Sequence, residues 1–367
     1  MISDLKYKIA LSMLPGIGGV LARNLVAYTG SVREVFSTSF SSLTKIPGIG
    51  EFNARKIKNA DVLERAETEI EFIEKNNIEV NFYTDENFPR RLKSCTDAPI
   101  LIYSRGKINF DEQRVISIVG TRNATDYGKT VVDELIKSFA ERNYKILVVS
   151  GLAYGIDVQA HRSALKYGIP TIGVVAHGLD KMYPALHRKT AGEMESNGGV
   201  VSDFHSQTKI DPQNFIKRNR IIAGLADATI VVESAPKGGA LITADIAASY
   251  NRDVFAYPGR AGDTYSQGCN QLIRNNGASL ITGINDLEFF MGWESSQKTD
   301  GVQPSLFVDL TKEEQQTVDL LKEKDEMFID QIAAELQMPV SKVSTTLLNL
   351  EFKNVILALP GKMYKLR

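Results

Sequence analysis

The chain has 367 residues, 43% of them hydrophobic and 24% charged, which is enough for about two or three globular domains with ordinary cores. Its 43 Lys and Arg nearly balance its 44 Asp and Glu, so any contact with nucleic acid must be a local basic patch. Two cysteines in separate segments have no metal-binding spacing, and no apolar run approaches the length of a membrane span. We therefore expect a cytoplasmic protein with no membrane insertion, no disulfide and no metal site.

Residues 1–72 are predicted to form a helical domain with an internal repeat. Pro15-Gly-Ile-Gly18 and Pro47-Gly-Ile-Gly50 match in register, and each is followed by a segment with helical periodicity. The repeat resembles the helix-hairpin-helix (SAM-like) motif, whose glycine turn offers backbone N–H groups to a DNA phosphate. The alternative is a plain helical hairpin whose glycines only end one helix and begin the next. Two copies in register favour helix-hairpin-helix ancestry without establishing contact with DNA.

Residues 73–292 are predicted to form an α/β domain, because short runs rich in Val and Ile alternate with helical patterns. We expect strands at Val115–Val119, Ile146–Ser150, Thr171–Val175, Gly199–Ser202, Thr229–Glu233, Val254–Ala256 and Ser279–Ile281, with helices such as Thr130–Arg142, Ile156–Tyr167 and Thr243–Asn251. The alternation predicts an extended Rossmann-like, doubly wound sheet that is mostly parallel. Ligands of such sheets bind beyond the carboxyl ends of the strands.

The C-terminal part of the chain is predicted to be a linker followed by a winged-helix domain. Residues 293–309 are polar and rich in turn-forming residues, as in linkers. Within residues 310–367, three amphipathic helices and a hairpin are expected at Lys312–Lys322, Ile329–Leu336, Val340–Leu350 and around Pro360-Gly361. Three helices and a wing make a winged helix, although its acidic first half makes DNA binding through it unpersuasive.

The most informative segment is a glycine-led turn after the first predicted parallel strand, Gly120-Thr121-Arg122. A glycine turn between strand and helix lets backbone N–H groups approach a phosphate. Dinucleotide sites have glycines in this turn, in the pattern G-x-G-x-x-G, so that the pyrophosphate can lie against the backbone. Here Arg122 occupies the position of the second glycine. Guanidinium binds phosphate oxygens bidentately, which favours a nucleotide or a phosphate polymer over NAD.

Two later segments also place glycine in a turn between a strand and a helix. Ser150 and Gly151 end a strand before a helix, and Lys237, Gly238, Gly239 and Thr243 follow another strand and could line the same phosphate site. Asp157 and His161 share a helix face and could act as an acid/base pair. The reading we favour is structural: Asp157 stabilises the helix start and His161 is half-buried. No recognised catalytic motif occurs, so we expect no catalytic residue and no cofactor.

The segment Gln213–Ile221 is the most typical of nucleic-acid binding. It places Lys217, Arg218 and Arg220 beside Phe215. Cations that follow a backbone and a ring that stacks on a base suit single strands, with about 1–3 kcal/mol per stacked base. Phe215 could instead belong to the core, and one arginine could be tied to a carboxylate. We expect at least one of the three cations to contact the ligand.

These motifs, in this order, closely resemble the DprA/Smf family (DNA-processing protein A). The resemblance rests on V-G-T-R-N-A-T-D-Y-G, S-G-L-A-Y-G-I-D-V-Q-A-H, G-L-D-K-M-Y-P, F-I-K-R-N-R-I-I-A-G-L and V-V-E-S-A-P-K-G-G-A-L-I-T-A. It implies a non-enzymatic protein that binds single-stranded DNA, protects incoming DNA during natural transformation and loads the RecA recombinase onto it. It also implies a homodimer formed through the Rossmann-like domain, and assistance to RecA in displacing single-strand-binding protein.

The resemblance also implies roles for individual residues. Arg122 would grip backbone phosphate, and Phe215 is the stacking candidate. Close-approach turns would come from Gly120, Thr121, Ser150, Gly151, Gly238 and Gly239, and the pocket would be lined by Arg218, Asn219 and Arg220. The chain departs from the family pattern at Ile216, where proline is common, at the variable position Lys217, at His177, which replaces glycine, and around Asp203-Phe204-His205.

Two other functions compete with this reading. One is a related Rossmann-like enzyme that hydrolyses the N-glycosidic bond of nucleoside monophosphates. Its P-G-G-x-G-T-x-x-E pattern is not matched by P-K-G-G-A-L-I-T-A-D, which lacks the last glycine and the glutamate in register. The other is an interaction scaffold whose winged helix recruits a partner beside a vestigial pocket. The presence of Arg122 and of the R-N-R triplet argues against a vestigial pocket.

Overall fold

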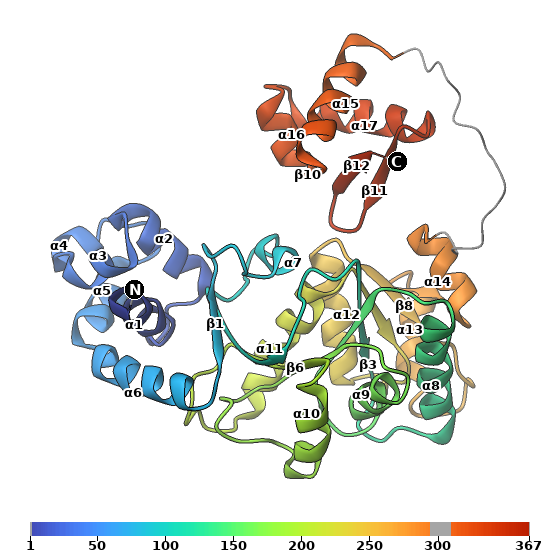
Figure 1. Cartoon of the computed structure of the whole chain (residues 1–367), viewed down its shortest axis with the longest axis horizontal. Helices are drawn as coiled ribbons and strands as arrows, with labels where there is room; N and C mark the ends of the chain where they lie inside the picture. Colours follow the sequence, from blue (N-terminus) through green and yellow to red (C-terminus); the bar gives the residue numbers. More distant parts are fainter. Residues whose placement is uncertain (1, 294–309, 367) are drawn as a thin grey trace.

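A computed structural model of the chain describes residues 2–293 and 310–366 (Figure 1). Figure 1 shows a helical N-terminal part, a central sheet with helices on both faces, and a small C-terminal part. Most of the predicted linker, residues 294–309, lies outside the described residues. Its first residue, Trp293, instead packs its ring against Tyr144, with centroids 5.7 Å apart. None of the helices in the described ranges is long and apolar enough to cross a membrane.

The N-terminal part consists of helices with two matching turns. The helices are α1 (Ile2–Ser12), α2 (Gly19–Thr29), α3 (Val32–Ser37), α4 (Phe40–Leu43), α5 (Gly50–Asn59) and α6 (Val62–Lys75). Gly16 and Gly48, equivalent in the two P-G-I-G turns, have φ of +78° and +81°, a left-handed backbone that favours glycine. The sequence repeat is therefore also a structural repeat, as expected for tandem helix-hairpin-helix motifs. Helix α6 continues past residue 72, where we expected this domain to end.

The central sheet has nine strands. They are β1 (Glu79–Phe82), β2 (Leu101–Lys107), β3 (Arg114–Val119), β4 (Ile146–Ser150), β5 (Thr171–Val174), β6 (Gly198–Ser202), β7 (Ala228–Val231), β8 (Asp253–Ala256) and β9 (Ser279–Leu280), in the order β1-β2-β6-β5-β4-β3-β7-β8-β9. The seven predicted strands are present and mutually parallel. Strands β1 and β2 were not predicted; they add an antiparallel edge to β6.

Helices cover both faces of this sheet. They are α7 (Arg90–Lys93), α8 (Asp126–Glu141), α9 (Ile156–Lys166), α10 (Arg188–Met194), α11 (Pro212–Leu225), α12 (Gly239–Ser249), α13 (Gln267–Arg274) and α14 (Ile284–Met291). On β3, Ile116 and Ile118 pack with α8, α9 and α14, whereas Val115 and Val119 pack with α7, α11 and α12. Since neighbouring residues point to opposite faces and both faces are buried, the strands read as continuous apolar runs.

The N-terminal helices share a hydrophobic core with the antiparallel edge of the sheet. Ile9 and Leu25 belong to the same buried cluster as Phe82 and Leu101. A buried carboxylate strengthens this junction: Glu69 of α6 accepts hydrogen bonds from the backbone N–H and the hydroxyl of Ser206, at 2.8 and 2.5 Å. The N-terminal part is therefore docked onto the sheet rather than tethered to it.

The C-terminal part has its own core and three helices, as predicted for a winged helix. Its elements are α15 (Lys312–Lys324), β10 (Glu326–Phe328), α16 (Ile329–Glu335), α17 (Val340–Phe352), β11 (Ile356–Leu359) and β12 (Met363–Leu366). The predicted hairpin pairs β11 with β12, and the unpredicted β10 joins β12 as a third strand. At the tip of the hairpin, the Pro360 carbonyl accepts a hydrogen bond from Arg252 at 3.3 Å.

Candidate functional site

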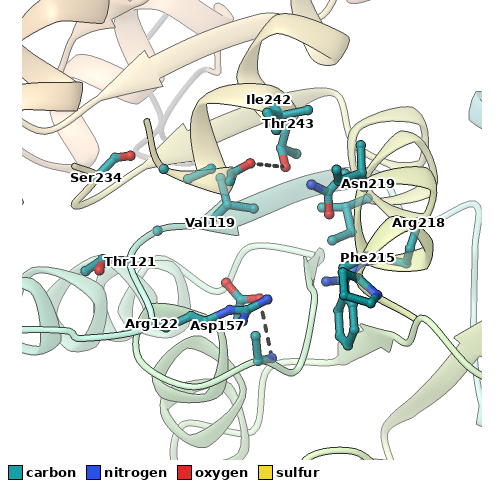
Figure 2. A pocket seen from close by; sticks show the side chains of 18 of the residues that line it. Val119, Thr121, Arg122, Asp157, Phe215, Arg218, Asn219, Ser234, Ile242 and Thr243 are labelled. Atoms are coloured by element: carbon teal, nitrogen blue, oxygen red, sulfur yellow. Dashed lines mark hydrogen bonds between the residues drawn. The ribbon is translucent and has the colours of Figure 1, made fainter. Parts of the chain in front are cut away.

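A hollow of about 500 Å³ lies beyond the carboxyl ends of β3 and β7 (Figure 2). The chain proceeds from β3 through β4 and β5 to β6, then returns to place β7 on the other side of β3. The loops after β3 and β7 therefore leave the sheet towards opposite faces, and a crevice opens between them. Loop residues Gly120–Arg122 and Ser234–Gly239 contribute to the lining, and α11 and α12 close the sides. This topological switch point is where ligands of such sheets bind.

Arg122 and Phe215 face each other across this hollow, which we call the first hollow. Figure 2 shows Arg122 reaching in from the loop after β3 and Phe215 reaching in from α11. The guanidinium lies 5.5 Å from the centroid of the ring, within cation–π range. The Arg122 side chain is exposed and makes no hydrogen bond or ion pair with another described residue. Its fork of donors is therefore available to a ligand.

The loop that carries Arg122 is held by Glu233, which follows β7 and is 3% exposed. The backbone N–H of Thr121 donates to the Glu233 carbonyl at 2.7 Å. The backbone N–H and the hydroxyl of Thr125 donate to the Glu233 carboxylate at 2.9 and 2.5 Å. The Thr125 hydroxyl also caps α8 by accepting from the N–H of Gly128. From the sequence, Glu233 was predicted only to end a strand; the signal for its role is an acidic residue directly after a buried apolar run.

The glycines predicted to admit a ligand differ in what surrounds them. A Cβ on Gly120 would stand 2.5 Å from the Ile156 side chain, and one on Gly151 would stand 2.4 Å from the Arg218 guanidinium. These two glycines are needed for the packing of the chain itself. A Cβ on Gly239, by contrast, would have nothing within 4 Å. Gly239 is the first residue of α12, so the N–H groups of this helix end are accessible from the first hollow.

Arg218 lines the first hollow, but its guanidinium is largely used inside the protein. The residue is 4% exposed, and its Nη1 donates to the carbonyls of Gly151, at 2.6 Å, and Val174. Burial lowers the pKa of Arg218 to about 10, against the opposing effect of the nearby Asp157 carboxylate. These bonds make Arg218 a buried brace that holds β4, β5 and α11 together, and its contact with the ligand stays a prediction.

Arg220 and Lys217 do not lie in the first hollow, which corrects the prediction that the basic residues of α11 form one cluster. Successive helical residues are rotated by about 100°, so Arg218 and Arg220 lie nearly on opposite sides of α11. Arg220 forms an ion pair with Asp203 at 2.6 Å, the carboxylate partner that sequence analysis had considered for one arginine. Lys217 is exposed on the same side as Arg220. Asn219 does line the first hollow, as predicted.

Three other predicted positions also lie outside the first hollow. Ser150 is completely buried and its hydroxyl donates to the Ile118 carbonyl at 2.6 Å, so it joins β4 to β3. Gly151 lies beneath Arg218, and Lys237 is exposed on the loop after β7 without lining the hollow. Gly120, Thr121, Gly238, Gly239 and Thr243 do contribute to its lining.

Asp157 and His161 form no acid/base pair, which agrees with the structural reading. His161 is 0% exposed, more deeply buried than expected, and its Nδ1 lies 2.7 Å from the Thr171 hydroxyl. Because that hydroxyl donates to the Val148 carbonyl, it accepts a hydrogen bond from the Nδ1–H of His161. Burial lowers the pKa of His161 to about 3 and raises the pKa of Asp157.

Tyr183 is a lining residue that sequence analysis quoted only within a family motif. Its ring meets Phe215 edge to face, with centroids 5.9 Å apart, and it is 44% exposed. Its backbone N–H donates to Nε2 of the buried His177 at 3.1 Å, so the histidine that replaces the usual glycine helps to position this tyrosine. Two aromatic rings at the rim offer a surface on which a base could stack.

The chemistry of the first hollow is that of anion binding. Asp157 is the one acidic side chain among the described residues that line it. Both cysteines are free and buried, and burial raises the pKa of Cys95 to about 11 and that of Cys269 to about 12, which agrees with a packing role. Within the described parts of the chain, no three His, Cys, Asp or Glu side chains are grouped to hold a metal ion.

The fold and the site define a class: an α/β protein with a Rossmann-like sheet, an anion-binding hollow at its switch point, and flanking helix-hairpin-helix and winged-helix domains. Family models agree with this description. DNA recombination-mediator protein A matches residues 79–291, the DprA winged helix domain matches residues 304–362, and the SAM-like helix-hairpin-helix tandem matches residues 8–60. The chain belongs to the DprA/Smf family.

Individual relatives support the same assignment over most of the chain. The chain is 30% identical to Protein Smf of Synechocystis sp., over 100% of this chain and 99% of that protein. It is 38% identical to DNA processing protein DprA of Bacillus subtilis, over 56% of this chain and 68% of that one. The X-ray structure of DprA from Streptococcus pneumoniae superimposes with a TM-score of 0.63 at 28% identity, covering 77% of this chain and 96% of that chain.

A second solved structure adds information about a ligand. DNA processing protein A from Helicobacter pylori, whose structure is described as showing a single-stranded DNA binding mode, superimposes with a TM-score of 0.52 at 27% identity. The match covers 58% of this chain and 94% of that chain.

Proposed function

We propose that this protein binds single-stranded DNA in the first hollow and loads the RecA recombinase onto it during DNA uptake and recombination. The observation that carries the proposal is the unpaired guanidinium of Arg122 opposite the ring of Phe215 at the switch point of the sheet. A cation that binds backbone phosphate beside a ring that stacks on a base is the arrangement that suits a single strand. Membership of the DprA/Smf family supports the same function.

The residues proposed to contact DNA are some of those predicted from the sequence, with Tyr183 added. Arg122 binds a phosphate, Phe215 and Tyr183 stack on bases, and the N–H groups at the start of α12 bind a second phosphate. Gly120, Thr121, Asn219, Gly238 and Gly239 complete the contact surface. Three further predicted residues, Ser150, Gly151 and Arg218, lie beneath this surface and support it. The Ser150 hydroxyl and the Arg218 guanidinium donate to carbonyls inside the protein, and the missing Cβ of Gly151 leaves room for Arg218.

The rest of the proposal follows the family. The protein acts without catalysis in the cytoplasm as a homodimer formed through the Rossmann-like domain. It protects incoming single strands and helps RecA to displace single-strand-binding protein. The domains are proposed to cover residues 1–72, 73–292 and 310–367, with a linker between the last two.

The test is DNA binding across a salt series, using single-stranded and double-stranded oligonucleotides, wild type and Arg122→Ala. Wild type is expected to prefer the single strand, and the variant to bind it about tenfold more weakly, with the salt slope reduced by about 0.7 for one lost phosphate contact. Lys137→Ala on α8 is the matched control, because among the described residues Lys137 pairs only with Glu141, and it lies far along the helix from the Arg122 loop.

Equal binding by wild type and Arg122→Ala would contradict the proposal. Release of free base from nucleoside monophosphates would support the competing enzymatic function instead. RecA loading is tested separately, by the rate at which RecA filaments form on single strands coated with single-strand-binding protein. Wild type is expected to accelerate filament formation and Arg122→Ala is not.

A further inference from the structure

A second hollow, of about 480 Å³, lies between the helix-hairpin-helix part and the sheet domain. The first P-G-I-G turn, Gly16–Gly18, forms one wall, and Lys217 and Arg220 of α11 form the other. Ile216, which is 52% exposed, lines both this hollow and the first one. The two hollows therefore meet at a single exposed side chain.

The periodicity of α11 explains this arrangement. Phe215, Asn219 and Ile222 recur at helical spacing and face the first hollow, whereas Lys217 and Arg220 are rotated towards the second. Helix α12 also contributes to both hollows: Ile242 lines the first, and Ile246, one turn later, lines the second. Ile216, Ile242 and Ile246 thus lie where the two hollows adjoin, and we call these three side chains the isoleucine ridge.

The second hollow is basic although the whole chain is nearly neutral. Lys217 is exposed and makes no hydrogen bond or ion pair with another described residue. The Nζ of Lys56, from the second helix-hairpin-helix repeat, lies 3.1 Å from where a Cβ on Gly16 would stand. Arg220 is offset by Asp203, and Asp97 in the lining offsets one lysine, so one positive charge remains in excess. Lys217 lies in the lining, whereas Lys56 lies beside it with its Nζ 4.2 Å from the centroid of the Phe52 ring.

The walls of the second hollow are held in place by the packing between the two domains. Arg23, on α2, donates to the Thr96 carbonyl at 2.6 Å. Arg220 donates to the backbone carbonyl of Asp97, and Tyr250 donates to its carboxylate. With the Glu69–Ser206 contact described above, these bonds fix the P-G-I-G turn opposite α11. The walls of the second hollow are therefore held in position by hydrogen bonds within the protein.

We propose that the second hollow extends the single-strand site, so that one DNA strand crosses the isoleucine ridge and contacts both hollows. The proposal rests on the proposed function of the first hollow. Phosphates of the segment beyond the ridge contact Lys217, Lys56 and the N–H groups of the P-G-I-G turn, while sugars or bases lie against Ile216. A flexible single strand can follow this path, whereas duplex DNA resists sharp bending, with a persistence length of about 50 nm.

The test is the affinity for oligothymidines of about 4 to 20 nucleotides, measured for wild type, Lys217→Glu, Asp97→Asn and the Lys137→Ala control. Short oligonucleotides occupy the first hollow alone, so their affinity is expected to be the same in all four proteins. For long ones, Lys217→Glu is expected to lose about tenfold in affinity and Asp97→Asn to gain about twofold to threefold, because the charge near the strand changes in opposite directions.

The outcomes separate this proposal from the one on which it rests. An unchanged affinity of Lys217→Glu at every length would overturn the extension and leave the first hollow as the whole site. An equal loss at every length would also overturn it, because Lys217 would then act on the first hollow. If Arg122→Ala binds every length as wild type does, the proposed function of the first hollow has failed instead.

Discussion

Three arginines in the predicted DNA-binding segments have three different surroundings. Arg122 is exposed and unpaired among the described residues, Arg218 is buried against backbone carbonyls, and Arg220 is paired with Asp203. An arginine whose donors are already used offers little to a phosphate, and its removal leaves buried acceptors without partners. Exposure and existing partners, more than the residue type, decide which arginine has donors available to a ligand.

At the scale of the residue, Arg218→Ala is expected to lower the free energy of unfolding by about 2–4 kcal/mol, because the carbonyls of Gly151 and Val174 lose a buried donor. Arg122→Ala is expected to change it by less than about 0.5 kcal/mol. Urea unfolding of both variants provides the measurement. A stable Arg218→Ala protein would show that the guanidinium is not a structural brace.

His161 is expected to make stability depend on pH. Its pKa is about 3 in the folded protein and near the ordinary 6.5 when unfolded, so the unfolded chain binds the extra proton between these values. Stability is therefore present above pH 6.5 and is lost as the pH falls, by roughly 2 kcal/mol from this group between pH 7 and pH 5. Urea unfolding at several pH values should show a smaller loss for His161→Asn, since His177 is retained in both proteins. Parallel curves would refute the assignment.

At the scale of the element, the loop after β3 depends on a residue that follows β7. Glu233 accepts hydrogen bonds from Thr125 and, through its own carbonyl, from Thr121, so two loops that meet at the switch point are tied together. A carboxylate near the start of α8 also interacts favourably with the positive end of the helix dipole. The loop that carries Arg122 is therefore held by a residue that lies outside its own sequence.

Glu233→Ala is accordingly expected to cost about 2–4 kcal/mol of stability, because the Thr125 N–H and hydroxyl lose their buried acceptor. DNA binding should weaken as well, because the Arg122 loop loses its anchor, although Glu233 itself is not proposed to contact DNA. Urea unfolding and DNA binding would be measured on the same preparations. Glu233→Gln, which keeps one acceptor oxygen, is the matched control and should lose less of both properties.

At the scale of the whole molecule, the two flanking domains relate to the sheet in different ways. The N-terminal helices share a buried cluster with β1 and β2, whereas the winged helix has a core of its own around Leu321, Leu347 and Leu350. Domains with separate cores unfold separately, and those that share one do not. The N-terminal domain is therefore structurally continuous with the sheet domain, and the winged helix is an addition to it.

Truncation from the two ends is expected to give opposite results. Removing residues 294–367 should leave the affinity for single-stranded DNA within about twofold, because neither hollow loses a lining residue. Removing residues 1–75 should give a poorly soluble chain without a cooperative unfolding transition, because Phe82 and Leu101 lose their cover. Size-exclusion chromatography, urea unfolding and DNA binding measure the three properties. A soluble, fully active chain without residues 1–75 would contradict the shared core.

The sequence alone was sufficient for the class of fold and for expecting Arg122, Phe215 and Gly239 near one another at the carboxyl ends of the strands, where they line the first hollow. Short apolar runs rich in Val and Ile, alternating with helical patterns, predict strands buried on both faces, and a glycine turn between strand and helix lets a phosphate approach the backbone. Only the tertiary structure shows which sides of α11 the cations occupy and that Arg218 donates to the carbonyls of Gly151 and Val174. It also shows that Glu233 anchors a loop over 100 residues away along the chain and that the first P-G-I-G turn faces Lys217. These are contacts between segments distant in the sequence, and burial and hydrogen bonding across them determine which polar groups remain available to a ligand.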